Sequence, residues 1–357
     1  MNVSPLWIKR FKDEYLLYNE LTEKTYLVSR DVIFVLKEIL RLGSLEKAQR
    51  HLIKFFDESS LKSIINFLKK NKFLSNRKNN LKEHKLLFKV KPSFVYLFYV
   101  LSIIILIFSL KNIFSLNLTS DDLFITDSIW FILVFYAAWL FLTLFHEFSH
   151  LFVANAFGCY GRIYFKTIFV FPALVTYIPK VVFLERPKRL LVHFAGMFMD
   201  YLMISIFAVL ITLFPQYSAV LRFFIMIKFI SLVSQLNLHL RTDLYFVIED
   251  VLNTINLKKD TLSFLKKIFH RKRKITLINK QWQILLFLVI LIFGYSLNIW
   301  FFIKFFLPGI QQISHIKERQ LLKISFIIIY LAHILIHFIK KTIRHKHYGV
   351  STVKKSL

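Results

Sequence analysis

The chain has 357 residues, of which 56% are hydrophobic and 17% aromatic, and its formal net charge is +28 at pH 7. This composition excludes an ordinary soluble globule and predicts a polytopic membrane protein. The single cysteine, Cys159, excludes an intrachain disulfide framework. The basic residues lie mostly between apolar runs, a pattern that favours cytoplasmic loops and contact with anionic membrane lipids over nucleic-acid binding.

Residues 1–85 are polar and mixed, so we expect a small soluble domain and no signal peptide. Residues 15–18 and 25–28 predict two strands joined by a polar turn, and Trp7 and Phe11, which flank Lys9, indicate a third strand.

Three short helices are predicted after these strands. Ser29 is a candidate N-cap for a helix that ends before Gly43, and Ser44 for a second helix. Asp57 would cap a third, whose apolar residues recur at helical spacing over 61–68. A β-hairpin followed by three helices is a winged-helix arrangement. The alternative is a cytoplasmic cap that only stabilises the membrane part.

This order resembles the winged-helix peptide-recognition domains of ribosomal-peptide tailoring systems, typified by the peptide chaperone of pyrroloquinoline quinone biosynthesis. The matching residues are 18–19, 25–29 and the helix over 32–40. The resemblance implies that a leader peptide binds as an added strand along the hairpin edge. A peptide-tailoring enzyme or an exporter is a further expected partner.

The predicted membrane domain, residues 93–340, follows a basic linker at 86–92 and precedes a basic tail at 341–357. Prolines and charged residues interrupt the apolar sequence of residues 160–187, so this segment is not expected to span the membrane. It indicates a cytoplasmic-side hairpin or re-entrant loop. The long basic segments fall on one side, which places both termini in the cytoplasm. We therefore expect a mainly α membrane protein with six spans, over 93–110, 128–157, 190–214, 220–240, 281–307 and 321–339.

The second apolar run contains an HExxH motif, from His146 through Glu147 to His150. Positions i and i+4 share one face of a helix, so both imidazoles can bind one metal ion. Glu147 can then serve a water molecule as general base. Such polar residues are costly in a hydrocarbon-length helix, which favours a functional site. The alternative is a buried polar patch between helices.

A catalytic zinc site usually has three protein ligands and one open position. Asp243 is the best third candidate, because the topology places it at the same cytoplasmic level as the HExxH motif. Glu249 and Asp250 are second choices, and His239 could also reach inward. The alternative for Asp243 is a solvated helix end beside Arg241.

Residues 128–257 resemble the site-2 protease family of intramembrane zinc metalloproteases. The HExxH motif followed by Phe157-Gly158 matches the first family motif, and residues 171–173 and 195–196 match intervening landmarks. Asn237, with Asp243 six residues later, is similar to the second motif of the bacterial peptide-maturation branch; so are Tyr245, Asp250 and residues 256–257.

The resemblance implies that Asp243 is the third zinc ligand. Two positions depart from the pattern: the family proline after the asparagine is Leu238, and the glycine after the aspartate is Leu244. That glycine helps the backbone to turn at the ligand, so Leu244 makes the local geometry a question for the structure.

These features predict a zinc endopeptidase that cuts a small ribosomally made peptide or a membrane-bound precursor. Zinc on His146, His150 and Asp243 would lower the pKa of a water ligand towards roughly 7, and Glu147 would move its proton to the leaving amine. Asn237 would bind substrate or orient Asp243. One alternative is an inactive protein of the same fold that acts in peptide export or self-immunity. Another is a histidine-box oxidoreductase, which needs more clustered histidines.

Other polar residues also lie in the apolar runs. We expect Lys228 to snorkel along a short fourth span, with a position facing the catalytic cavity as the alternative. His333 and His337 are four residues apart and could bind a metal, but no carboxylate neighbours them. His193 is expected to pack at a helix start.

Overall fold

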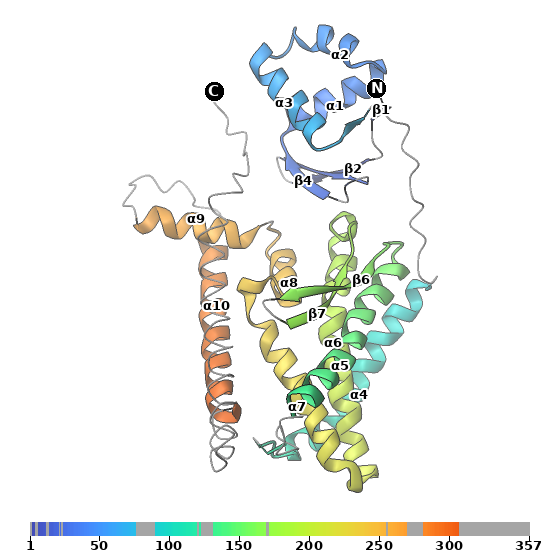
Figure 1. Cartoon of the computed structure of the whole chain (residues 1–357), viewed down its shortest axis with the longest axis vertical. Helices are drawn as coiled ribbons and strands as arrows, with labels where there is room; N and C mark the ends of the chain where they lie inside the picture. Colours follow the sequence, from blue (N-terminus) through green and yellow to red (C-terminus); the bar gives the residue numbers. More distant parts are fainter. Residues whose placement is uncertain are drawn as a thin grey trace. The chain divides into compact units, whose positions relative to one another are not determined.

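The computed structural model describes residues 2–3, 6–11, 14–20, 22, 24–75, 90–119, 121–122, 131–168, 171–254, 256–269 and 281–306. The predicted sixth span, the basic tail, His333, His337 and most of the linker lie outside these ranges. The chain forms two compact units (Figure 1). The first contains Met1–Pro92, Leu151–Arg162 and Tyr177–Arg189, and the second contains Ser93–His150, Ile163–Thr176 and Leu190–Leu357.

The first unit contains the predicted strands, which are confirmed. They form an antiparallel sheet of order β2-β3-β4, with β2 at Leu6–Phe11, β3 at Glu14–Asn19 and β4 at Lys24–Val28. Leu17 in the central strand lies opposite Ile8 on one side and Tyr26 on the other. A separate short pair joins β1 (Asn2–Val3) to β5 (Leu74–Ser75).

The three predicted helices are also confirmed, as α1 (Arg30–Leu42), α2 (Leu45–Leu52) and α3 (Glu58–Lys70). Ser29, Ser44 and Asp57 occupy the N-cap positions, but only Asp57 makes a side-chain cap, accepting a 2.8 Å hydrogen bond from the Ser60 N–H. Gly43 ends α1 in the left-handed region, at φ 62°, where glycine has no steric penalty.

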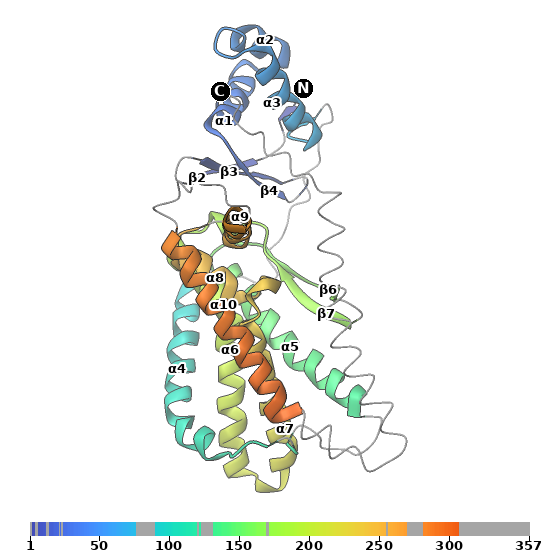
Figure 2. The same cartoon turned by 90° about the vertical axis from the view of Figure 1, so that its left-hand side faces the viewer.

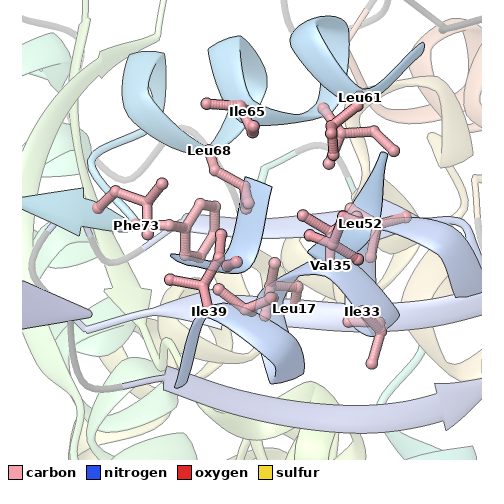
Figure 3. Packing of buried hydrophobic residues seen from close by; sticks show 14 residues of the cluster. Leu17, Ile33, Val35, Ile39, Leu52, Leu61, Ile65, Leu68 and Phe73 are labelled. Carbon is pink, nitrogen blue, oxygen red and sulfur yellow. The ribbon is translucent and has the colours of Figure 1, made fainter. Parts of the chain in front are cut away.

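One apolar core joins the sheet to the three helices (Figure 3). Leu17 of β3, Val35 of α1, Leu52 of α2 and Leu68 of α3 are all fully buried. Burying each such side chain contributes about 1.5–3 kcal/mol, so this contact is what fixes the helices on the sheet. The role of this domain in peptide recognition stays a prediction.

The first unit also contains the segment Tyr177–Arg189, which includes a 3₁₀ turn at Val181–Phe183. Lys9 Nζ of β2 donates to the carbonyl oxygens of Val182 at 3.2 Å and Leu184 at 2.6 Å. The Phe183 ring lies edge-on to Trp7 and Tyr18, and Lys180 pairs with Glu20 at 2.7 Å. These contacts attach the strand β2 to this segment.

Five helices among the described residues are long and apolar enough to cross a membrane. This confirms a mainly α fold with multi-pass character. Figure 2 shows α4 and α6 running in one general direction, with α5 inclined to them. The helices are α4 (Pro92–Ser115), α5 (Phe131–Ala156), α6 (Arg186–Leu213), α7 (Ser218–Gln235) and α10 (Gln281–Phe301), the last continuing as a π-helical turn at Phe302–Phe306.

The predicted fourth span was too long. Its helix α7 ends at Gln235, and a 3₁₀ turn at Leu238–Leu240 follows. Thr242 Oγ1 donates to the Gln235 carbonyl at 2.6 Å, which closes the chain back on the helix end. The shorter helices α8 (Asp243–Val251) and α9 (Leu257–Phe269) come next.

The segment predicted as a hairpin or re-entrant loop contains two strands. β6 (Arg162–Ile168) and β7 (Phe171–Tyr177) pair in a two-stranded sheet. This agrees with the hairpin interpretation, whereas the side of the membrane on which the sheet lies stays a prediction.

Candidate metal centre

Three predicted ligands converge within the second unit. His146 and His150 lie one turn apart on α5, with their Nε2 atoms 3.4 Å apart. Asp243, the first residue of α8, places Oδ2 at 2.9 Å from His146 Nε2 and 3.2 Å from His150 Nε2. One donor atom from each side chain therefore lies within 4.8 Å of the other two.

The tautomers of both histidines follow from their other ring nitrogens. His150 Nδ1 lies 2.7 Å from the carbonyl oxygen of Val192, which can only accept, so Nδ1 carries the proton. His146 Nδ1 lies 3.0 Å from Asp200 Oδ2. A carboxylate also only accepts, so His146 Nδ1 carries the proton as well. Both Nε2 lone pairs thus face Asp243.

This donor set fits a divalent metal ion. Two unprotonated nitrogens and a carboxylate oxygen facing one another need a cation between them. Ligand atoms about 2.0–2.1 Å from a tetrahedral zinc ion lie roughly 3.3–3.4 Å apart, close to the 2.9–3.4 Å separations here.

Gly196 of α6 makes room for the histidine pair. A Cβ at this position would lie 2.3 Å from His146 Nε2 and 2.5 Å from His150 Nε2, distances that real Cβ atoms do not show. The sequence marked Gly196 only as a family landmark. Its close approach to two imidazoles explains why no larger residue fits there.

Glu147 lies on the same helical turn as His146 and contacts strand β7. Its Oε2 accepts a 2.7 Å hydrogen bond from the Thr176 N–H, and the Thr176 hydroxyl donates to the Glu147 carbonyl at 3.0 Å. The predicted general base is therefore held by the sheet β6-β7. Thr176 carried no signal in the sequence.

Asp200 of α6 is a residue that the sequence interpretation missed. It is fully buried and accepts hydrogen bonds from Lys228 Nζ at 2.5 Å and Ser231 Oγ at 3.0 Å, besides its contact with His146. The expectation that Lys228 snorkels is wrong, because its side chain is only 1% exposed and its charge is compensated by Asp200. An aspartate within an apolar run was the available signal.

The comparisons with known proteins agree with a metalloprotease role. "Putative peptide zinc metalloprotease protein YydH" of Bacillus subtilis (strain 168) is 28% identical over 145 residues, which are 38% of this chain and 57% of that protein. The chain thus spans little more than half of the length of this distant relative. No family model matches the chain. No solved structure matches it either.

The two departures from the family pattern have a packing explanation. Leu238 is fully buried in an apolar cluster with Tyr245 and Phe287, and Leu244 packs against the same cluster. The tight turn before the third ligand is made at Arg241, whose φ is 56°, and not at Leu244, which lies inside α8. The ligand set is therefore compatible with both leucines.

Glu249 and Asp250, the second choices for the third metal ligand, have other partners. Glu249 accepts from the Tyr245 hydroxyl at 2.5 Å and from the Leu257 N–H at 2.7 Å, so it joins α8 to α9, and burial raises its pKa. Asp250 lies 3.6 Å from His193 Nε2, and the His193 ring stacks on Phe246. The described metal-binding group contains neither carboxylate.

Asn237 and His239 were also predicted to belong to the site. The Asn237 amide donates to Asn298 Oδ1 at 3.2 Å, and its predicted contact with substrate stays a prediction. Gln235 Oε1, which accepts a 3.0 Å hydrogen bond from the Asp243 N–H, is the group that fixes the backbone of the third ligand. The side chain of His239 lies outside the described part of the chain.

Proposed function

We propose that the chain is a membrane-embedded zinc endopeptidase that hydrolyses a peptide bond in a small ribosomally made peptide or a membrane-bound precursor. The observation that carries this proposal is the convergence of His146 Nε2, His150 Nε2 and Asp243 Oδ2, with Glu147 next to the first ligand. The name of the distant relative from Bacillus subtilis supports the same reaction class.

When bound, zinc supplies a Lewis acid that polarises the peptide carbonyl and lowers the pKa of a water ligand towards about 7. The chain's own residues do the rest. Glu147 takes a proton from the attacking water and delivers it to the leaving amine, so it ends each cycle in its initial state. Thr176 orients the Glu147 carboxylate through its N–H. Val192 and Asp200 keep both imidazoles in the tautomer that presents Nε2.

An extended substrate suits this arrangement. A membrane helix hides its carbonyls in internal hydrogen bonds, so the scissile segment must unwind before attack. The two-stranded sheet β6-β7 offers strand edges on which an extended peptide can pair. Thr176 of β7 contacts Glu147, which supports an attack site beside this sheet.

We further propose that the N-terminal domain delivers the peptide in the cytoplasm, where both termini would lie, by binding a leader segment as an added strand. In the sheet order β2-β3-β4 the strand β4 has one described strand neighbour, β3. Leu27 on β4 is 40% exposed and supplies an apolar contact for such a peptide. Deleting residues 1–85 should abolish the affinity for the peptide, and an unchanged affinity would remove this role.

The protease proposal is tested by co-expressing the intact chain with a precursor peptide encoded beside its gene. Glu147→Gln should stop processing while protein level and zinc content stay at wild-type values. The matched control is Glu185→Gln, which alters an exposed glutamate and should leave processing intact. Continued processing by Glu147→Gln would overturn the proposal. A wild-type chain that binds zinc but leaves every such precursor intact would instead support an inactive protein of the same fold.

A further inference from the structure

A buried ion pair joins two membrane-spanning helices next to the metal centre. The Asp200 side chain on α6 is 0% exposed and the Lys228 side chain on α7 is 1% exposed, with 2.5 Å between Lys228 Nζ and Asp200 Oδ1. Moving two charges into an apolar interior is expensive, and well-packed apolar residues would hold the helices together equally well. The pair therefore requires an explanation beyond helix packing.

The two oxygens of Asp200 have different partners. Oδ1 accepts from Lys228, whereas Oδ2 accepts from the His146 Nδ1–H and from the Ser231 hydroxyl, both at 3.0 Å. Lys228 Nζ also donates to the carbonyl oxygen of Leu142 at 2.8 Å. Leu142 precedes His146 by four residues, so Lys228 holds the helical turn that carries this ligand as well as the carboxylate that orients it.

The formal charges of the site balance only if Lys228 is included. Two neutral imidazoles contribute nothing, while Glu147, Asp200 and Asp243 contribute three negative charges. A divalent ion offsets two of them, and Lys228 offsets the third. Because an uncompensated charge is costly when it is buried between apolar helices, the lysine permits a third carboxylate beside the metal centre.

The second histidine ligand is held differently. His150 Nδ1 donates to a main-chain carbonyl, that of Val192, which no side-chain substitution removes. His146 alone depends on side chains for its orientation. A substitution of Asp200 can therefore disturb the orientation of His146 while that of His150 is kept.

We propose that Asp200 and Lys228 are positioning residues of the metal centre. Asp200 holds the His146 ring with Nε2 towards the metal, and Lys228 fixes Asp200 and compensates its charge. This inference rests on the zinc site of the proposed function. Second-sphere partners of this kind typically contribute a factor of about 10–100 to metal affinity.

The test is a zinc titration of the purified full-length protein in lipid nanodiscs against a chromophoric chelator, together with its thermal unfolding. Asp200→Asn should weaken zinc binding roughly 10- to 100-fold. Lys228→Met leaves an uncompensated carboxylate and should lower both thermal stability and zinc affinity. The control Arg222→Met removes a cation from the same helix α7, away from the site, and should leave zinc affinity unchanged.

The double variant Asp200→Asn/Lys228→Met separates a positioning role from a structural one. With neither charge present it should recover thermal stability, yet its zinc affinity should stay roughly 10- to 100-fold below that of the wild type. A double variant with wild-type stability and wild-type zinc affinity would overturn the proposal.

A milder variant tests the same role in case the charged pair is needed for folding. Ser231→Ala removes one hydrogen bond to Asp200 and should weaken zinc binding about 2- to 10-fold at unchanged thermal stability. Its control is Ser205→Ala, because the buried Ser205 hydroxyl has no partner among the described residues. Equal zinc affinities of both serine variants and the wild type would contradict the inference alone, whereas a wild-type chain that binds no zinc would overturn the proposed function as well.

Discussion

The N–H of Thr176 donates a 2.7 Å hydrogen bond to Glu147 Oε2, and the Thr176 hydroxyl donates to the main-chain carbonyl of the same glutamate. Strand β7 thus contacts both the side chain and the backbone of the proposed base. The two residues are 29 positions apart, so the position of the base depends on how the sheet β6-β7 packs on α5.

Substitutions at Thr176 should separate its two hydrogen bonds. Thr176→Val keeps the N–H and should lower kcat for peptide cleavage about 2- to 10-fold, because it loses one neutral hydrogen bond. Thr176→Pro also removes the N–H that holds the carboxylate, a bond worth about 1.5–3 kcal/mol, so kcat should fall roughly 10- to 100-fold. Steady-state kinetics with parallel zinc analysis checks both values. Equal kcat for the two variants would show that the N–H has no role.

Gly196→Ala should abolish zinc binding at ordinary zinc concentrations. The new Cβ would lie 2.3 Å from His146 Nε2, so an imidazole must leave its position. Alanine favours a helix over glycine by about 1 kcal/mol, so helix α6 itself is not weakened. Zinc content by mass spectrometry and thermal unfolding measure the two effects. Gly43→Ala is the control, because its strain at φ 62° should lower stability without changing zinc content.

Asp57 should make the stability of α3 dependent on pH. Hydrogen bonds from Ser59 and from the Ser60 N–H lower the pKa of Asp57 to about 2. Because the folded pKa lies below the unfolded value of about 3.9, this cap stabilises the helix above pH 4 and is lost as the pH falls towards 2. Hydrogen–deuterium exchange of α3 in the intact chain should accelerate in Asp57→Ala at pH 7.

The matched control for this cap is Ser44→Ala. Ser44 occupies the N-cap position of α2 but its side chain makes no cap hydrogen bond, so exchange of α2 should change little. Equal effects of the Asp57 and Ser44 substitutions on their helices would contradict the prediction.

Cys159 should react slowly with alkylating reagents in the folded protein. Burial raises the pKa of its thiol to about 11, although Lys180 lowers it in part. Only the thiolate is nucleophilic, so the alkylation rate should rise as the pH approaches 11 and should jump when the protein unfolds. Mass spectrometry gives an unambiguous signal because the chain has one cysteine. Rapid alkylation of native protein at pH 7 would contradict this expectation.

The grouping of the three candidate ligands was predictable, because it follows from helical spacing and from the number of ligands that a metal site needs. His146 and His150 are one helical turn apart, and the need for a third ligand led to Asp243. Asp200 and Lys228 were not paired in advance, because their contact depends on which faces of α6 and α7 meet. Each residue alone was visible as a charge in an apolar run, and only the packing of these helices identifies its partner.

The elements of the N-terminal domain were predictable for a similar reason. Caps, turns and apolar periodicity are encoded over a few residues, and Gly43 ends its helix where expected. The end of α7 was not predicted, since leucines recur at 236, 238 and 240 while the helix ends at Gln235. Gln235 accepts hydrogen bonds from Thr242 and Asp243 at this helix end, and such contacts cannot be read from a hydropathy pattern.

The attachment of Lys9 to the segment Tyr177–Arg189 has a mechanical consequence. One end of this segment continues directly from Thr176, which holds the proposed base, and the other enters α6, where the Val192 carbonyl orients a histidine ligand. A covalent chain transmits displacement in both directions. A displacement of Lys9 would therefore act on the stretch of chain between Thr176, which holds Glu147, and the helix whose Val192 carbonyl orients His150.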